Sequence, residues 1–199
     1  MFKIIFSALL AALAVFAWEA LSWKVIGWHE NGYRTFRNEE AVAEVLKANA
    51  TSGQGIYVLP ASSEPSAVAT VEEKKAHLKR QNDAMETGPY MYAIVRPGRS
   101  EISTGMNMGL SFVRNFFCGL LVAALMSQVV AYYPARIGLA AAMGLFAGLT
   151  SDLPMWIWFE SPGRDTMVNI ADHLVAWIIG GAVLGLFVGK TPTAETDRL

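Results

Sequence analysis

The sequence predicts a mainly α-helical integral membrane protein, a four-transmembrane-helix bundle with a small α/β extracytoplasmic insertion between the first two helices. Four apolar stretches each approach the roughly 20 residues that a helix needs to cross about 30 Å of hydrocarbon. None shows the strict two-residue alternation of a membrane β-barrel. Most of the charged and turn residues lie between the first two stretches. The apolar stretches are residues 4–23, 108–132, 137–159 and 168–189.

Residues 1–23 are expected to form the first transmembrane helix. A cleaved signal peptide is the alternative, because the run ends in the small-residue pattern Val15-Phe16-Ala17. Trp18 and Trp23 favour an uncleaved helix, since aromatic side chains anchor spanning helices at the membrane interface. A three-helix region, residues 106–190, and a short tail, residues 191–199, complete the chain.

The basic residues of the short segments predict the orientation. Lys3, Arg136 and Lys190 lie in segments that four helices place on one side, which we expect to be the cytoplasm together with both termini and the tail. Residues 24–105 and the loop 160–167 then face the other side. The net charge of −1 gives no basic surface for nucleic acid, so the expected partners are the lipid bilayer and a membrane protein or a second copy.

The polar segment 24–105 reads as helix, strand, helix, strand. Asn38 before two glutamates is typical of a helix N-cap, and residues 70–86 favour a solvent-exposed helix. Residues 55–60 and 90–95 are short β-rich runs bounded by glycine and proline, so they are predicted to be strands.

Ionisable residues inside the apolar stretches are the most specific chemical feature. At about 1.5 Å per residue they all fall in the outer third of the bilayer, although chain direction alternates. Charges there are costly unless they face inward and pair, so we expect Arg114 to pair with Asp152 or Asp172. The set comprises Glu19, Arg114, Asp152, Asp172 and His173.

Three interpretations of this set stay open: polar contacts that hold the helices together, a proton or ion path, and a divalent metal site. Asp172 and His173 are adjacent and point about 100° apart on a helix, which makes shared coordination awkward. His29 and Glu30, just beyond the first helix, could approach the same set from outside. No catalytic residue, cofactor site or metal site is assigned from the sequence.

Glycines at four-residue spacing on the last two helices predict close helix packing. They favour a tight hairpin of these two helices, with self-association of the chain as the alternative. The residues are Gly144, Gly148, Gly181, Gly185 and Gly189.

Short motifs along most of residues 10–190 resemble an uncharacterised family of bacterial four-helix integral membrane proteins. The resemblance implies this topology and a bacterial cytoplasmic (inner) membrane, and it implies no reaction or ligand. The motifs are Ser22-Trp23, Trp28-His29, Asn38-Glu39-Glu40, Gly55-Ile56-Tyr57 with Pro60, Gly88-Pro89, Arg96-Pro97, Leu153-Pro154 with Trp156 and Trp158, and Asp172 with Trp177.

Three functions follow as hypotheses. The leading one is a non-enzymatic accessory or assembly protein, because the sequence shows no phosphate loop, haem motif or clustered metal motif. The alternative is a small transporter or proton- or ion-coupled protein that uses Asp152, Asp172 and His173. A membrane-embedded metal-dependent hydrolase is third.

Overall fold

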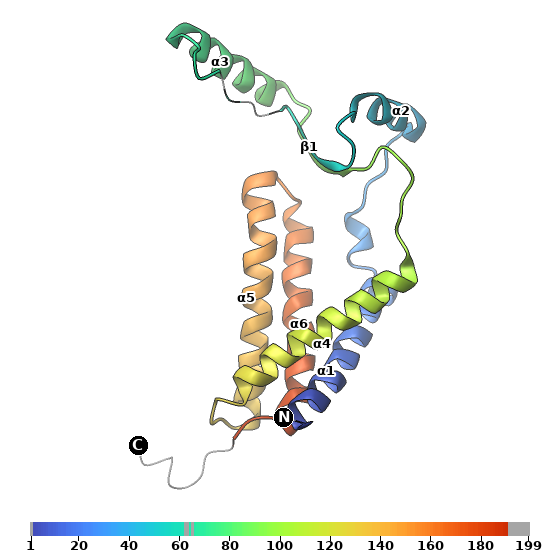
Figure 1. Ribbon diagram of the computed structural model, residues 1–199, viewed down its shortest axis with the longest axis vertical. Coiled ribbons are helices and arrows are strands. Elements are labelled where there is room, and N and C mark those ends of the chain that lie inside the picture. Colours follow the sequence, from blue (N-terminus) through green and yellow to red (C-terminus); the bar gives the residue numbers. More distant parts are fainter. Residues whose placement is uncertain (1, 62–63, 65, 191–199) are drawn as a thin grey trace. The chain divides into compact units, whose positions relative to one another are not determined.

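The computed structural model describes residues 2–61, 64 and 66–190, so the predicted tail 191–199 lies outside the described residues. It forms two compact units: a helical unit, Met1–Arg34 with Ile102–Leu199, and a polar unit, Thr35–Glu101. The polar unit is therefore narrower than the expected segment 24–105. The elements are α1 (Phe2–Leu21), η1 (Ser22–Ile26), η2 (Glu30–Gly32), α2 (Glu39–Asn49), β1 (Gly55–Leu59), α3 (Val71–Thr87), β2 (Met91–Val95), α4 (Thr104–Met126), α5 (Tyr133–Phe159) and α6 (Gly163–Phe187) (Figure 1).

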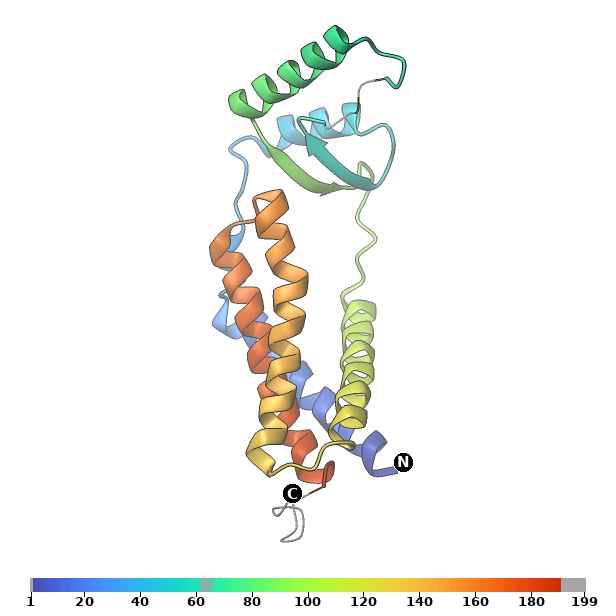
Figure 2. The ribbon, with the colours of Figure 1, turned by 90° about the vertical axis from the view of Figure 1, so that its left-hand side faces the viewer.

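Among the described residues, four helices are long and apolar enough to cross a membrane, as the sequence predicted. The first is the continuous helix Phe2–Ile26, in which the π-helix η1 extends α1, and the others are α4, α5 and α6. Helices α5 and α6 run side by side along much of their length, and α1 packs on both α6 and α4 (Figure 2). Helix α4 makes most of its contacts with α1 and few with α5 and α6.

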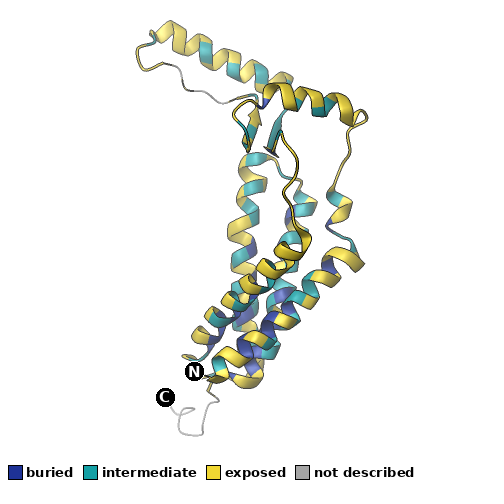
Figure 3. Ribbon diagram, turned by 45° about the vertical axis from the view of Figure 1, so that its right-hand side comes forward, coloured by how far each residue is buried: buried dark blue, intermediate teal, exposed yellow. Residues whose placement is uncertain are grey.

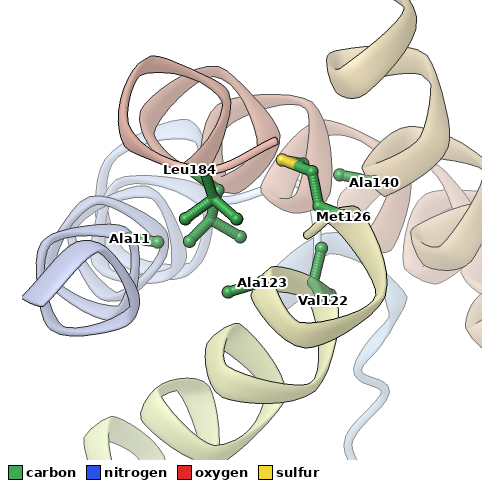
Figure 4. Packing of buried hydrophobic residues seen from close by; sticks show 7 residues of the cluster. Ala11, Val122, Ala123, Met126, Ala140 and Leu184 are labelled. Atoms are coloured by element: carbon green, nitrogen blue, oxygen red, sulfur yellow. The ribbon is translucent and has the colours of Figure 1, made fainter. Parts of the chain in front are cut away.

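The hydrophobic core of the helical unit lies toward the end where α4 stops and α5 begins. Buried residues gather there (Figure 3), and small side chains bring the four helices together around Met126 and Leu184 (Figure 4). The cluster is Ala11, Val122, Ala123, Met126, Ala140, Leu184 and Val188. At the other end of the helices, charged side chains as well as apolar ones line the space between them.

The glycine pattern serves packing within the chain. A Cβ on Gly144 would lie 2.5 Å from the carbonyl oxygen of His173, and one on Gly181 would lie 2.6 Å from the Cβ of Ala140. Gly148 likewise approaches Ile170, and Gly185 approaches Tyr133. Gly189 lies beyond the end of α6 with φ +105°, beside Arg136. The hairpin of α5 and α6, not an outer face for self-association, uses these glycines.

Three helix boundaries differ clearly from the prediction. Helix α4 stops at Met126 rather than residue 132, because the backbone of residues 129–131 pairs with Lys190 instead: the Ala131 N–H donates to the Lys190 carbonyl at 2.8 Å. Residues 133–136, predicted as a turn, form the first turn of α5, where Pro134 is tolerated. Helix α6 begins at Gly163 rather than residue 168. Its first turn is polar, so apolar content misses it, and an acidic residue there is favourable at a helix N-terminus.

The polar unit confirms the predicted order of helix, strand, helix and strand. Asn38 caps α2 by accepting from the Ala41 N–H at 3.0 Å, and Thr70 with Glu73 forms a reciprocal capping box on α3. Strands β1 and β2 pair antiparallel, with Gly55 opposite Val95 and Leu59 opposite Met91. Helix α3 has no buried residue, as its polar composition predicted.

Candidate functional site: a polar cavity in the helical unit

A cavity of about 990 Å³ lies among the four long helices of the helical unit. It is lined by apolar side chains and by a set of charged ones. All five ionisable residues singled out in the sequence line it: Glu19, Arg114, Asp152, Asp172 and His173. We call this space the polar cavity.

Arg114 does not pair with an aspartate, so that part of the sequence prediction was wrong. Its guanidinium forms an ion pair with Glu19 on α1 and also donates to the Asn115 side chain, from Nε at 3.1 Å and from Nη2 at 2.9 Å. Asn115 in turn donates from Nδ2 to Glu19 Oε2 at 2.9 Å. The physical reason is that α4 packs on α1, so the nearest acid is the one that α1 presents.

Asp172 on α6 is held from the α1 side. The indole N–H of Trp18 donates to its Oδ1 at 2.7 Å, and Nε2 of His29 lies 3.4 Å from its Oδ2. His29 is buried, lies 3.1 Å from the Ser22 hydroxyl, and stacks on Trp23 with ring centroids 4.1 Å apart. His29 thus reaches the set from beyond the helix, one of the possibilities that the sequence raised.

A sharp reversal of the chain puts His29 in this position. Helix Phe2–Ile26 ends at Gly27, which has φ +65°, a left-handed conformation that favours glycine. Trp28 and His29 consequently fold back onto the last turns of the helix, where the Trp28 indole N–H donates to Ser22 at 2.7 Å. The fully buried Ser22 hydroxyl joins these two side chains.

Asp152 on α5 faces α6. Its Oδ1 accepts from Asn169 Nδ2 at 3.0 Å, and its Oδ2 accepts from the Ser151 hydroxyl at 2.7 Å and lies 3.6 Å from Nε2 of His173. This group ties α5 to α6, just as Asp172 ties α6 to α1. Among the described residues that are not exposed, no buried side-chain nitrogen or oxygen lacks a hydrogen-bond partner.

Two chemical arrangements can be tested against this geometry. Ser22, His29 and Asp172 resemble the composition of a hydrolase triad, but the same His29 nitrogen faces both partners, whereas a triad uses one ring nitrogen for each. Ser22 is also fully buried, so its hydroxyl cannot meet a substrate. For metals, no three His, Cys, Asp or Glu side chains gather in a metal-binding arrangement in the described part of the chain.

Several polar partners were not singled out from the sequence. Asn115, Asn169, Ser22 and Trp18 complete the hydrogen bonds. The sequence marks Trp18 only as an interface anchor and Ser22 only as a motif residue, and only the position of the two asparagines inside apolar helices could have pointed to them. Arg136 was treated as a turn residue that sets orientation. It is buried instead, and it donates from Nε to the Ala131 carbonyl and from Nη1 to the Gly185 carbonyl, both at 3.0 Å.

Comparison with protein-family models, with curated proteins and with solved structures gives no match to this chain.

Proposed function

We propose that this chain is a multi-pass integral membrane protein that acts without catalysis, as an accessory or assembly protein. The helices support the membrane part of this proposal, because they leave large apolar side chains exposed along their length. Leu121 and Phe117 on α4, Phe146 on α5 and Leu186 on α6 are examples. Such surface is costly in water at about 25 cal/mol per Å², and it suits a lipid environment.

The orientation proposed from the sequence completes this picture. The turn between α4 and α5 faces the cytoplasm of a bacterial cell, and the polar unit faces away from it across the inner membrane. Membership of the bacterial four-helix family that the sequence resembles is part of the same proposal.

Cysteine labelling in intact cells tests this orientation. In a Cys118→Ala background, Ser52→Cys in the polar unit should react with a membrane-impermeant thiol reagent, and Gln128→Cys in the α4–α5 turn should react only after lysis. The reverse pattern would invert the topology. Release of the protein by alkaline carbonate would overturn the membrane assignment itself.

One observation carries the non-enzymatic proposal: the three carboxylates of the polar cavity are engaged in contacts between helices. Glu19 joins α1 to α4, Asp172 joins α6 to Trp18 on α1, and Asp152 joins α5 to α6. Polar groups used in this way fix the arrangement of helices at a depth where unpaired charge is costly. Substitution of these residues should therefore reduce the amount of folded protein.

A proton- or ion-coupled function is the second candidate, because two carboxylate–imidazole pairs line the same cavity. They are Asp172 with His29 and Asp152 with His173. Proteoliposomes that contain a trapped pH-sensitive dye separate the candidates. The accessory proposal predicts the same proton leak as protein-free vesicles. A flux that disappears in a folded Asp172→Asn variant would favour coupling.

A further inference from the structure

The charged side chains that line the polar cavity differ strongly in exposure according to their sign. The side chains of Lys24 and Arg114 are 79% and 57% exposed. Those of Glu19, Asp152 and Asp172 are only 24%, 17% and 14% exposed. The acids are engaged in contacts between helices, so the charged groups that remain most accessible to an occupant are the ammonium of Lys24 and the guanidinium of Arg114.

The cations also keep unused bonding capacity. Arg114 has five N–H groups, and its contacts with Glu19 and Asn115 use Nε and Nη2. Its Nη1 group makes no hydrogen bond to any described residue. Lys24 has one ion pair, a 3.8 Å contact with Glu30. A guanidinium and an ammonium, here from two helices that line the same cavity, are groups that proteins commonly use to hold a phosphate.

The rest of the lining is apolar. Phe16, Ala20 and Trp23 come from the first helix, Met108 from α4 and Ala176 from α6. Free phosphate gains nothing from such a wall, whereas an acyl chain is stabilised by it at about 25 cal/mol per Å² of buried apolar surface. Since α4 has few contacts with α5 and α6, the cavity separates α4 from α6 at this level.

We infer that the polar cavity binds a phospholipid, with its phosphate against Arg114 and Lys24 and its acyl chain along the apolar wall. Lys24 lies two residues before the end of the continuous helix Phe2–Ile26, where headgroups meet a spanning helix. The inference rests on the proposed membrane location of the helical unit. It gives the polar cavity a ligand class, which the accessory function does not require.

Native mass spectrometry of the full chain in neutral detergent tests the inference with three probes. They are dioleoylphosphatidylglycerol, dioleoylglycerol, which lacks the phosphate, and inorganic phosphate. We expect one molecule of the phospholipid to bind and to survive activation, with weaker retention of dioleoylglycerol. Equal retention of both lipids would overturn the phosphate contact. Retention of inorganic phosphate equal to that of the phospholipid would overturn the lipid assignment.

Substitutions of single residues test where the phospholipid binds. Lys24→Gln and Arg114→Gln should each weaken phospholipid binding on the order of tenfold, as expected for loss of a charge-assisted hydrogen bond. Arg164→Gln is the matched control, because Arg164 is 54% exposed in the same unit but does not line the cavity. Equal binding by Lys24→Gln, Arg114→Gln and the wild type would overturn the proposal.

The two proposals fail separately. Should Arg114→Gln fail to fold, the highly exposed Lys24 decides the result alone. Carbonate extraction measures membrane insertion and not lipid specificity. A protein that stays in the membrane but shows no preference for phosphate therefore contradicts only this inference.

Discussion

Arg114 on α4 and Glu19 on α1, 95 residues apart in sequence, form an ion pair that Asn115 closes into a three-way contact. This contact is the polar link between α4 and the rest of the helical unit at the level of the cavity. At the other end of the helix the link is apolar, through Val122, Ala123 and Met126. Helix α4 is thus held at two separate levels by two different kinds of contact.

We expect a double-mutant cycle of Arg114→Leu and Glu19→Gln to show coupling of about 0.5–3 kcal/mol. Loss of Arg114 alone leaves a carboxylate without its counter-charge in a water-poor site, and Glu19→Gln should partly relieve that penalty. Thermal unfolding in detergent measures each variant. A cycle of Arg114→Leu with Asp152→Asn should be additive, and coupling there instead would contradict the observed pairing.

Alanine substitutions of two glycines on α5 should affect the stability of the protein differently. Gly144→Ala places a Cβ 2.5 Å from a backbone oxygen of α6 and should destabilise the protein by about 1–3 kcal/mol. Gly138→Ala meets no atom within 4 Å and should be neutral or stabilise by up to about 1 kcal/mol, because alanine favours helix. Equal unfolding temperatures for the two variants would show that α5 and α6 do not pack as described.

Arg136→Met should cost about 1–3 kcal/mol. The variant keeps much of the side-chain volume but leaves the Ala131 and Gly185 carbonyls without their guanidinium donors. Arg99→Met, at an exposed position of the polar unit, is the control for loss of a positive charge. Unfolding in detergent compares them, and a loss for Arg99→Met as large as for Arg136→Met would argue against the buried role.

Ser22→Ala should destabilise the helical unit by about 1–3 kcal/mol, because the buried hydroxyl is the partner of Trp28 and His29. The Trp28 indole N–H resonance should move when its acceptor is removed, which gives a local readout by NMR. Ser52→Ala, at an exposed position, should leave both measurements unchanged. An unmoved Trp28 resonance in Ser22→Ala would contradict the hydrogen bond.

The N-terminus of α3 should lose stability in acid. The backbone N–H and then the hydroxyl of Thr70 donate to the Glu73 carboxylate and hold its pKa below the ordinary value of 4.5. A carboxyl pKa that is lowered by folding gives stability that is present above 4.5 and is lost as the pH falls through the lowered value. The ¹³C shift of the Glu73 carboxyl follows this titration, and a midpoint at or above 4.5 would contradict the capping box.

The spans and strands could be predicted because their causes are local. Apolar length marks the four helices, and residues such as Asn38 and Thr70 cap helices through bonds to their own neighbours. The boundary errors have one local and one distant cause. The first turn of α6 holds Arg164 and Asp165, which apolar content does not detect. The apolar residues 129–131 leave the helix because they pair with Lys190, about 60 residues further along the chain.

The pairing inside the polar cavity could not be predicted. The position of a residue along its helix gives its depth in the membrane, but it does not say which neighbouring helix the side chain faces. All five ionisable residues do line one cavity, yet Arg114 bonds to Glu19 because α4 lies against α1. The approach of His29 depends on a left-handed Gly27 and on contacts that span more than 140 residues of sequence. Hydropathy does not show which helices pack against each other, and it does not show that the chain turns back at Gly27.

The bridge between Val130 and Lys190 has a practical consequence for handling the protein. Lys190 exchanges backbone hydrogen bonds with residues 129 and 131, and the Ala131 carbonyl also accepts a hydrogen bond from Arg136. The segment after α6 therefore holds the connection between α4 and α5 in place through the backbone of Lys190. Affinity tags and reporter fusions joined after residue 190 leave these hydrogen bonds intact, whereas a truncation at the end of α6 would remove them.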